Sequence, residues 1–343
     1  MIEQSDIAHY LLSLGVVKPQ EVIEEGFTVV DASRRNSVFL AATRAGPTFV
    51  VKQAREGDAS SLTDEAEVLR LLAGSAVAEH VPAVVHHEPG GCLVLRTPGG
   101  ARDWSEHGGR FSRARARALG RVVADLHRLP IDVPACDAPA WPLLLAAPPH
   151  ELVLGLSAAA QDLVARIQAS DFVCGRLDEL GAAESDDALV HGDLRWENVL
   201  AVPAGGSRRR TRVLLADWES AGRADPALDV GSVLAEYLRA WVGSIPIVEV
   251  VDPGRLVASA RYPLTAMRPA MDAFWSAYRG ANPQGPALRR VIDMTAVRLL
   301  QTAIEVAQGL AAATAHVVTL LQLADNLLRR PDVAARDLLE LRA

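Results

Sequence analysis

The sequence predicts an α+β fold with a small antiparallel sheet at its N-terminal end and a larger, mainly helical remainder. Three short runs with period-two hydrophobicity lie at residues 27–31, 38–42 and 48–52, and two more follow at 81–85 and 92–96. A Thr-Pro-Gly-Gly turn then ends at Gly100, and apolar residues recur mostly at helical spacing after it. We therefore expect two lobes, an N-terminal lobe over residues 1–98 and a C-terminal lobe over residues 99–343.

The composition is that of an ordinary globular protein. The chain has 343 residues, of which 50% are apolar and 22% charged, and this length suits two lobes. A net charge of -7 argues against a general nucleic-acid binder. The N-terminus lacks the basic region of a signal peptide, and the uncharged stretch at 306–324 is expected to be a buried helix because polar residues interrupt it. Three scattered cysteines without metal-ligand spacing indicate a reducing compartment, so we expect a cytoplasmic protein. From the net charge and the lack of a membrane-spanning stretch, we expect no nucleic-acid partner and no membrane partner.

The predicted small sheet contains candidate nucleotide-binding residues. The polar loop between its first two strands, residues 32–37, carries Ser33 and Ser37 and can place backbone N–H groups over phosphates, although a plain surface hairpin has the same pattern because the loop lacks glycine. Lys52 ends the third strand. The acidic amphipathic helix that follows offers Glu65 or Glu67 as its partner, and we favour Glu65.

The strand at 92–96 ends at the predicted boundary between the lobes. We therefore expect a hinge at residues 94–97, with Val94 and Leu95 next to the adenine of a bound ATP. This assignment depends on the predicted topology and on no side-chain signature.

The strongest chemical pattern lies between residues 189 and 229. Asp193 and Asn198 follow His191 and Gly192, and Asp217 ends a short apolar strand. Phosphoryl transfer needs one carboxylate to orient and deprotonate an acceptor hydroxyl, and further oxygen ligands to hold Mg²⁺ against the phosphates. The spacing therefore indicates an ATP- and Mg²⁺-dependent phosphotransferase.

These motifs resemble those of a known family. The segment H-G-D-L-R-W-E-N at 191–198, the D-W-E at 217–219 and the A-D-P-A-L-D at 224–229 are similar to the motifs of the aminoglycoside phosphotransferase and choline-kinase family. The resemblance spans roughly residues 26–240 and implies a two-lobed kinase-like fold that transfers phosphate to an alcohol. Two departures are the glycine-free loop at 32–37 and Ala224, where the family usually has glycine.

The resemblance also implies a role for each matching residue. Asp193 would be the catalytic base, and His191 would brace its loop. Asn198 and Asp217 would bind Mg²⁺. Lys52 would contact the α- and β-phosphates of ATP while Glu65 orients it. Asp229 would hydrogen-bond the backbone of the catalytic loop.

The acceptor is the least constrained part of the prediction. Residues 240–343 contain nine acidic side chains and eleven arginines, a net charge of +2, which is a poor surface for a polycationic aminoglycoside. A second, looser pattern resembles kinases that act with a separate lyase in lanthipeptide- and thioamitide-type peptide biosynthesis. The pattern comprises the motifs R-R-R-T-R at 208–212, D-W-E at 217–219, D-V-G-S at 229–232, Tyr237-Leu238, Trp241 and S-I-P-I at 244–247. The favoured acceptor is accordingly Ser or Thr of a ribosomally made precursor peptide, which the lyase would convert to a dehydroamino acid.

Two other functions stay open. One is a kinase for a small hydroxylated substrate such as an antibiotic, a sugar or an amino alcohol. The other is a pseudokinase that serves as a binding scaffold. The presence of Lys52, Asp193, Asn198 and Asp217 together argues against the pseudokinase.

Overall fold

The computed structural model divides the chain into two compact units. Unit 1 comprises residues 1–107, 129–133 and 196–221, and unit 2 comprises residues 108–128, 134–195 and 222–343. Within these ranges the structure describes residues 2–23, 26–33, 37–44, 46–54, 59–107, 111–130, 133, 140–183, 185, 188–204, 207–246 and 258–342. The chain crosses from unit 2 to unit 1 between Arg195 and Trp196, inside the motif that the sequence singled out.

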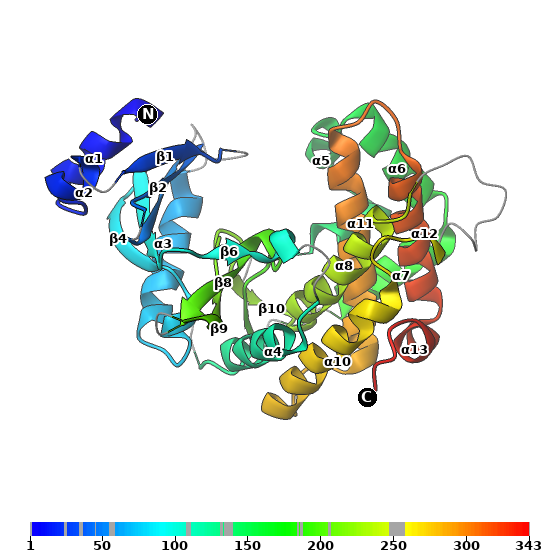
Figure 1. Cartoon of the computed structure of the whole chain (residues 1–343). Helices are drawn as coiled ribbons and strands as arrows, with labels where there is room; N and C mark the ends of the chain where they lie inside the picture. Colours follow the sequence, from blue (N-terminus) through cyan, green and yellow to red (C-terminus); the bar gives the residue numbers. More distant parts are fainter. Residues whose placement is uncertain are drawn as a thin grey trace. The chain divides into compact units, whose positions relative to one another are not determined.

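Unit 1 is built around a five-stranded antiparallel sheet in the order β1-β2-β3-β5-β4 (Figure 1). Its strands are β1 (Thr28–Asp31), β2 (Ser37–Ala42), β3 (Thr48–Gln53), β4 (Ala83–Glu88) and β5 (Cys92–Thr97). Alternate side chains such as Phe39, Val51 and Val94 are buried, and Ile7 and Leu11 of helix α1 (Ile7–Ser13) complete this core. The predicted antiparallel arrangement of the first three strands is confirmed.

Helix α3 (Ala59–Ala73) packs against β4 and β5. Its apolar residues at Leu62, Ala66 and Leu69 are buried at helical spacing. Glu65 is fully buried, whereas Glu67 is exposed. The helix begins before its acidic stretch at residues 64–67, and Leu62 already packs into the core.

A second sheet of unit 1 has the order β6-β8-β9. Its strands are β6 (Arg102–Asp103), β8 (Val199–Ala204) and β9 (Ser207–Leu215). The small and charged residues at 204–211 predict a turn in the sequence, but the arginine run at 208–210 lies in β9, so this prediction is wrong for most of its length. Backbone pairing of β9 with β8, from Val199 opposite Leu215 to Ala204 opposite Ser207, extends the strand through the charged run.

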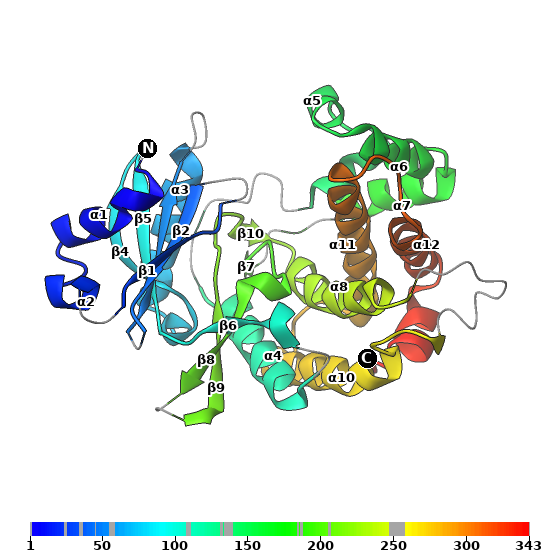
Figure 2. The ribbon, with the colours of Figure 1, turned by 45° about the horizontal axis from the view of Figure 1, so that its top comes forward.

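Unit 2 is mainly helical, with one two-stranded antiparallel sheet made of β7 (Ala188–Val190) and β10 (Gly222–Ala224). Helix α4 lies along α10, and α11 lies between α8 and α12 (Figure 2). The helices are α4 (Arg113–His127), α5 (His150–Leu154), α6 (Ala158–Gln168), α7 (Asp171–Ala182), α8 (Ala227–Gly243), α10 (Leu264–Ala281), α11 (Leu288–Gln308), α12 (Ala315–Arg329) and α13 (Pro331–Val333).

The sequence of residues 152–180 predicts a helical segment with an interruption at Gly175, but the structure has three helices here. Gly175 does not interrupt any of them, because this glycine lies inside α7. The breaks fall instead before two serine N-caps. The hydroxyl of Ser157 accepts from the N–H of Ala160, and the hydroxyl of Ser170 accepts from the N–H of Val173.

The uncharged stretch at 306–324 is not one buried helix, which corrects the sequence prediction. Helix α11 ends at Gln308, and α12 begins after Thr314, whose hydroxyl caps the N–H of Val317. Val306 and Val318 are both exposed. Among the described helices, none has the length and apolar character needed to cross a membrane.

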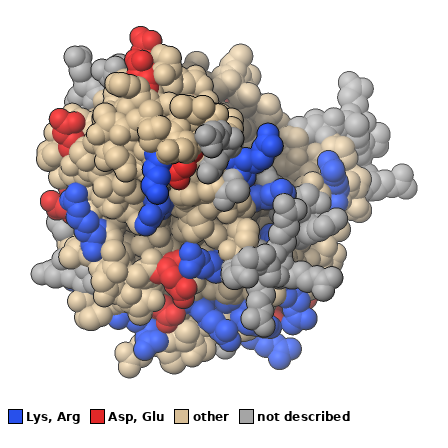
Figure 3. Space-filling view, turned by 60° about the vertical axis from the view of Figure 1, so that its left-hand side comes forward, with Lys and Arg blue, Asp and Glu red and all other residues tan. Residues whose placement is uncertain are grey.

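Charged side chains of both signs are interspersed on the face of the molecule that Figure 3 draws. This face therefore shows no single acidic patch, although the net charge of the chain is -7. The predicted absence of nucleic-acid and membrane partners stays a prediction.

The close approach of α4 and α10 predicts the effect of adding one methyl group. A Cβ on Gly120 would lie 2.3 Å from the carbonyl oxygen of Phe274, so Gly120→Ala should lower the free energy of unfolding by about 1–3 kcal/mol. A Cβ on Gly175 would meet nothing within 4 Å, so Gly175→Ala should raise it by up to about 1 kcal/mol. Urea denaturation of both variants measures the difference. Equal effects of the two substitutions would contradict this packing.

Candidate active site

The predicted catalytic loop starts where β7 ends in unit 2. All three residues of β7 are buried, and His191 directly after them is also fully buried. Gly192 has a φ of 79°, a left-handed conformation that favours glycine. The chain can therefore turn sharply there and carry Asp193 out of the core, where its side chain is 24% exposed.

Asp229, in the first turn of α8, holds this loop through its backbone. Its Oδ2 accepts the N–H of His191 at 2.8 Å, and its Oδ1 accepts the N–H of Gly192 at 3.0 Å. Burial opposes ionisation of this carboxyl, but hydrogen bonds from His127 and from the His191 backbone lower the pKa of Asp229 below its usual value. The contact that the family resemblance implies for Asp229 is thus present.

A second layer of polar residues fixes Asp229 in turn. His127, in the last turn of α4, lies 3.1 Å through Nε2 from Oδ2 of Asp229 and 2.9 Å through Nδ1 from the hydroxyl of Tyr278. The side-chain amide of Asn282 donates to that hydroxyl at 3.3 Å. All of these side chains are buried. The sequence analysis did not identify Tyr278 or Asn282, because nothing in their local sequence links them to His127.

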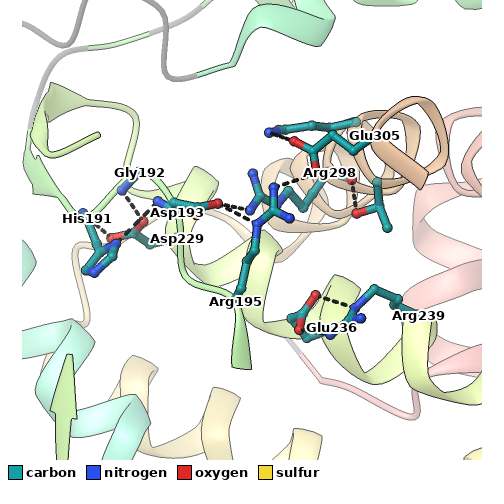
Figure 4. A network of polar contacts seen from close by, with 11 residues as sticks. His191, Gly192, Asp193, Arg195, Asp229, Glu236, Arg239, Arg298 and Glu305 are labelled. Atoms are coloured by element: carbon teal, nitrogen blue, oxygen red, sulfur yellow. Dashed lines mark hydrogen bonds and ion pairs between the residues drawn. The ribbon is translucent and has the colours of Figure 1, made fainter. Parts of the chain in front are cut away.

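Asp193 is held by two arginines (Figure 4). The Nε of Arg195 donates to its Oδ1 at 2.8 Å, and Arg298 on α11 donates to the same oxygen. Burial opposes ionisation of Asp193, but the charges of Arg298 and Arg195 outweigh it and lower the pKa of the carboxyl to about 2. Arg195 also donates through Nη2 to Glu305 at 2.5 Å.

Sequence reasoning missed three members of this cluster. The motif at 191–198 contains Arg195 but implies no role for it. Arg298 and Glu305 contribute only to the net charge of residues 240–343. Arg298 is 105 positions from Asp193 in the chain, so no local pattern reports their contact.

Unit 1 contains a separate cluster around Lys52, which is 5% exposed. Its Nζ donates to both carboxylate oxygens of Glu65 at 2.8 Å and to Oδ1 of Asp217 at 2.5 Å. Glu65 also accepts the backbone N–H of Trp218 at 3.1 Å. The contact supports Glu65 rather than Glu67 as the partner of Lys52. Burial opposes the charge of Lys52, but Glu65 and Asp217 outweigh it and raise its pKa.

The candidate metal ligands, Asn198 and Asp217, lie at the same end of the β8–β9 pair. Asn198 directly precedes Val199, which pairs with Leu215, and its carbonyl accepts the N–H of Ala216, the residue before Asp217, at 2.8 Å. Asp217 has a φ of 66°, which is uncommon outside glycine and concentrates at functional sites. Its side chain is 37% exposed. One carboxylate and one amide oxygen are hard donors that fit Mg²⁺, which usually takes its other ligands from phosphates and water. No group of three or more His, Cys, Asp or Glu side chains arranged for a metal occurs among the described residues.

The other predicted nucleotide contacts lie in the five-stranded sheet. Ser33 lies two residues after the end of β1. Its hydroxyl accepts the N–H of Val38, and its own N–H donates to Asp31. Ser37 is the first residue of β2. Residues 34–36 of the loop lie outside the described residues. Val94 and Leu95 are buried inside β5 and pair with β3 and β4 on either side. Their contacts with phosphate or adenine stay predictions.

The paired state of Asp193 predicts a pH dependence. Its pKa falls from 3.8 to about 2 on folding, so the pair stabilises the protein above pH ~4 and loses this contribution as the pH falls towards 2. Asp193→Asn should therefore unfold more easily than the wild type at pH 6, by about 2 kcal/mol, and the difference should vanish near pH 2. Denaturant titrations at several pH values measure it, with Asp162→Asn in an exposed pair as the control. A difference that does not change with pH would contradict the assignment.

The Lys52 cluster predicts unequal effects of two neighbouring glutamates. Glu65→Gln should lower the free energy of unfolding by about 3 kcal/mol, because it breaks a buried ion pair while Lys52 keeps Asp217. Glu67→Gln, on the exposed side of the same helix, should change it by less than about 0.5 kcal/mol. Thermal or urea denaturation of the two variants tests the difference. If Glu67→Gln is the more damaging, the pairing is wrong.

Comparisons with known proteins agree with this geometry. A model of the phosphotransferase enzyme family matches residues 26–274. No curated protein matches this chain. Among solved structures, the fold is similar to choline kinase LicA from Streptococcus pneumoniae, with a TM-score of 0.56 and 16% identity over 95% of this chain and 98% of that one.

Two further structures are similar at comparable levels. A choline/ethanolamine kinase family protein from Mesorhizobium loti gives a TM-score of 0.57 and 18% identity over 96% of each chain. Aminoglycoside phosphotransferase APH(3'')-Id from Streptomyces rimosus gives 0.53 and 20% identity over 94% of this chain and 99% of that one. These likenesses confirm the predicted kinase-like fold, and the matched family model shows that this chain belongs to the phosphotransferase enzyme family.

Proposed function

We propose that the protein is an ATP- and Mg²⁺-dependent O-phosphotransferase that phosphorylates a hydroxyl group. The observation that carries this proposal is the buried Lys52, held by Glu65 and Asp217. A buried ion pair of this kind is expensive to build and adds little net stability, so a functional reason for it is expected. A lysine fixed by a helix carboxylate is the usual device for orienting the phosphates of ATP in kinases.

The residues of the chain divide the work of the reaction. Asn198 and Asp217 would hold Mg²⁺, which when bound neutralises charge on the phosphates. Asp193 would orient the acceptor hydroxyl and accept its proton, while the acceptor oxygen forms a bond to the γ-phosphorus and the bond to ADP breaks. Asp229 and His127 keep the loop of Asp193 in position through backbone and side-chain hydrogen bonds. Complexes of LicA with AMP and of an aminoglycoside phosphotransferase with ADP support an adenine nucleotide as the donor.

For the acceptor, the two arginines on Asp193 argue against a polycation, as does the net charge of +2 over residues 240–343. The names of the similar structures, which include choline kinases and aminoglycoside phosphotransferases, support a small hydroxylated acceptor. The precursor-peptide acceptor and its partner lyase stay predictions from the sequence. The described cysteines, Cys92 and Cys174, form no disulfide, and the cytoplasmic location stays a prediction from the sequence.

Loss of the two essential carboxylates tests the proposal. Asp193→Ala and Asp217→Ala should each lower the rate of phosphate transfer by about 10²–10⁴-fold, because they remove the base and a metal ligand. Mass spectrometry of small hydroxylated compounds and of the peptide encoded beside the gene, each incubated with ATP and Mg²⁺, measures the transfer and separates the two acceptor classes.

The matched control is Asp162→Ala, which removes a carboxylate from an exposed pair on α6. This variant should retain full activity. A biological activity that survives both Asp193→Ala and Asp217→Ala would instead support the pseudokinase scaffold.

A further inference from the structure

The environment of Asp193 differs from what a catalytic base needs. A general base works best when its pKa lies near the working pH, whereas two guanidiniums hold the pKa of Asp193 at about 2. Both arginines share one oxygen of this carboxylate, Oδ1. In this structure Asp193 therefore acts mainly as the ion-pair partner of two arginines and is a weak base.

The two arginines are not equivalent. Arg195 has a second carboxylate, Glu305, which is itself held by Gln301 at 2.8 Å. The side chain of Arg298 is only 6% exposed, and Asp193 is the only acceptor that the structure gives its guanidinium among the described residues. A buried charge needs a paired anion at all times, so Arg298 can release Asp193 only to another anion.

The neighbouring charges do not supply that anion. On α8, Glu236 is bound to Arg239 of the same helix at 2.7 Å (Figure 4). Glu305 already accepts hydrogen bonds at both of its oxygens, one from Arg195 and one from Gln301. Both of these described carboxylates are already bound, so we expect the replacement anion to come from a bound ligand. A cationic acceptor would face two guanidiniums and be repelled.

We propose that the acceptor is a hydroxylated compound that also carries an anionic group, a carboxylate or a phosphate, and that Arg298 binds this group. The planar guanidinium matches either anion through two parallel N–H donors. This inference rests on the proposed phosphotransferase function and names its acceptor class.

Binding of the anion then prepares the base. When the acceptor anion takes the N–H donors of Arg298, Asp193 loses one of its two cations and its proton affinity rises. The acceptor hydroxyl gives its proton to Asp193, its oxygen bonds to the γ-phosphorus, and the bridging oxygen leaves with ADP. A neutral alcohol would leave Asp193 doubly paired. Acceptor recognition and activation of the base thus depend on the same arginine.

Ligand-observed NMR with matched compounds tests the proposal. The probes are linear hydroxy acids of several chain lengths, each compared with its hydroxyalkyl phosphate, its neutral amide and the corresponding amino alcohol. The acids or phosphates should bind the wild type at least about tenfold more tightly than the amides and amino alcohols. The better of the two anions identifies the group. Preferential binding of the amides or amino alcohols, or no binding by any anionic member, would overturn the proposal.

Variants separate recognition from folding. Arg298→Gln should abolish the preference for anions, and Arg298→Lys should restore part of it because a lysine keeps the charge but not the planar fork. Arg268→Gln removes a comparable arginine of α10, bonded to Glu340 and the carbonyl of Leu338, and should keep the preference. If Arg298→Gln folds and still prefers anions, Arg298 has only a structural role.

Nucleotide binding is measured on the same samples. Loss of Mg²⁺-dependent ATP binding in Asp217→Asn tests the phosphotransferase proposal independently of the acceptor. A wild type that binds hydroxy acids through Arg298 but binds no ATP would contradict the proposed function. A wild type that binds ATP but prefers neutral acceptors would contradict only the acceptor class. KM is measured for every probe to which the enzyme transfers phosphate. Arg298→Gln should raise KM for the probes that carry an anionic group and leave KM for the neutral probes unchanged.

Discussion

The organisation of unit 2 depends on one buried carboxylate, Asp229. It accepts two consecutive backbone N–H groups of the loop that carries Asp193, and it contacts His127 on α4. Through Tyr278 the same network reaches α10. A buried carboxylate left with fewer donors would be costly, so this set of contacts fixes the loop to the helices. The position of Asp193 is thus determined by the packing of helices that are far from it in the chain.

The two charged clusters use buried ion pairs for different purposes. In unit 1, Lys52 has two carboxylate partners, so its charge is retained and its position is fixed. In unit 2 the relation is reversed, because one carboxylate, Asp193, has two cationic partners. Net stabilisation from buried pairs is small, since desolvation offsets most of the Coulomb attraction. Their effect here is orientation. The first cluster fixes the position of the Lys52 ammonium group, and the second fixes the Asp193 carboxylate and the arginines beside it.

Local sequence patterns predicted the small sheet well, because hydrophobic alternation and turn residues act over a few positions. They also predicted the Lys52–Glu65 contact. The errors have physical causes. Gly175 predicts a helix break, but the serine N-caps at Ser157 and Ser170 decide where those helices begin. The arginine run at 208–210 predicts a turn, but pairing with β8 keeps it in a strand.

By itself the sequence determined the type of reaction, since the motifs around Asp193 and Asp217 are contiguous along the chain. The roles of the individual residues stay predictions from the same motifs. Only the tertiary structure decided what surrounds them. Arg298 is 105 positions from Asp193, and His127 is 102 positions from Asp229. Such contacts arise from the packing of α11 and α4 in the core, and neither helix carries a local signal of its partner. The charge environment of Asp193, on which the proposed acceptor class depends, is therefore a property of the fold.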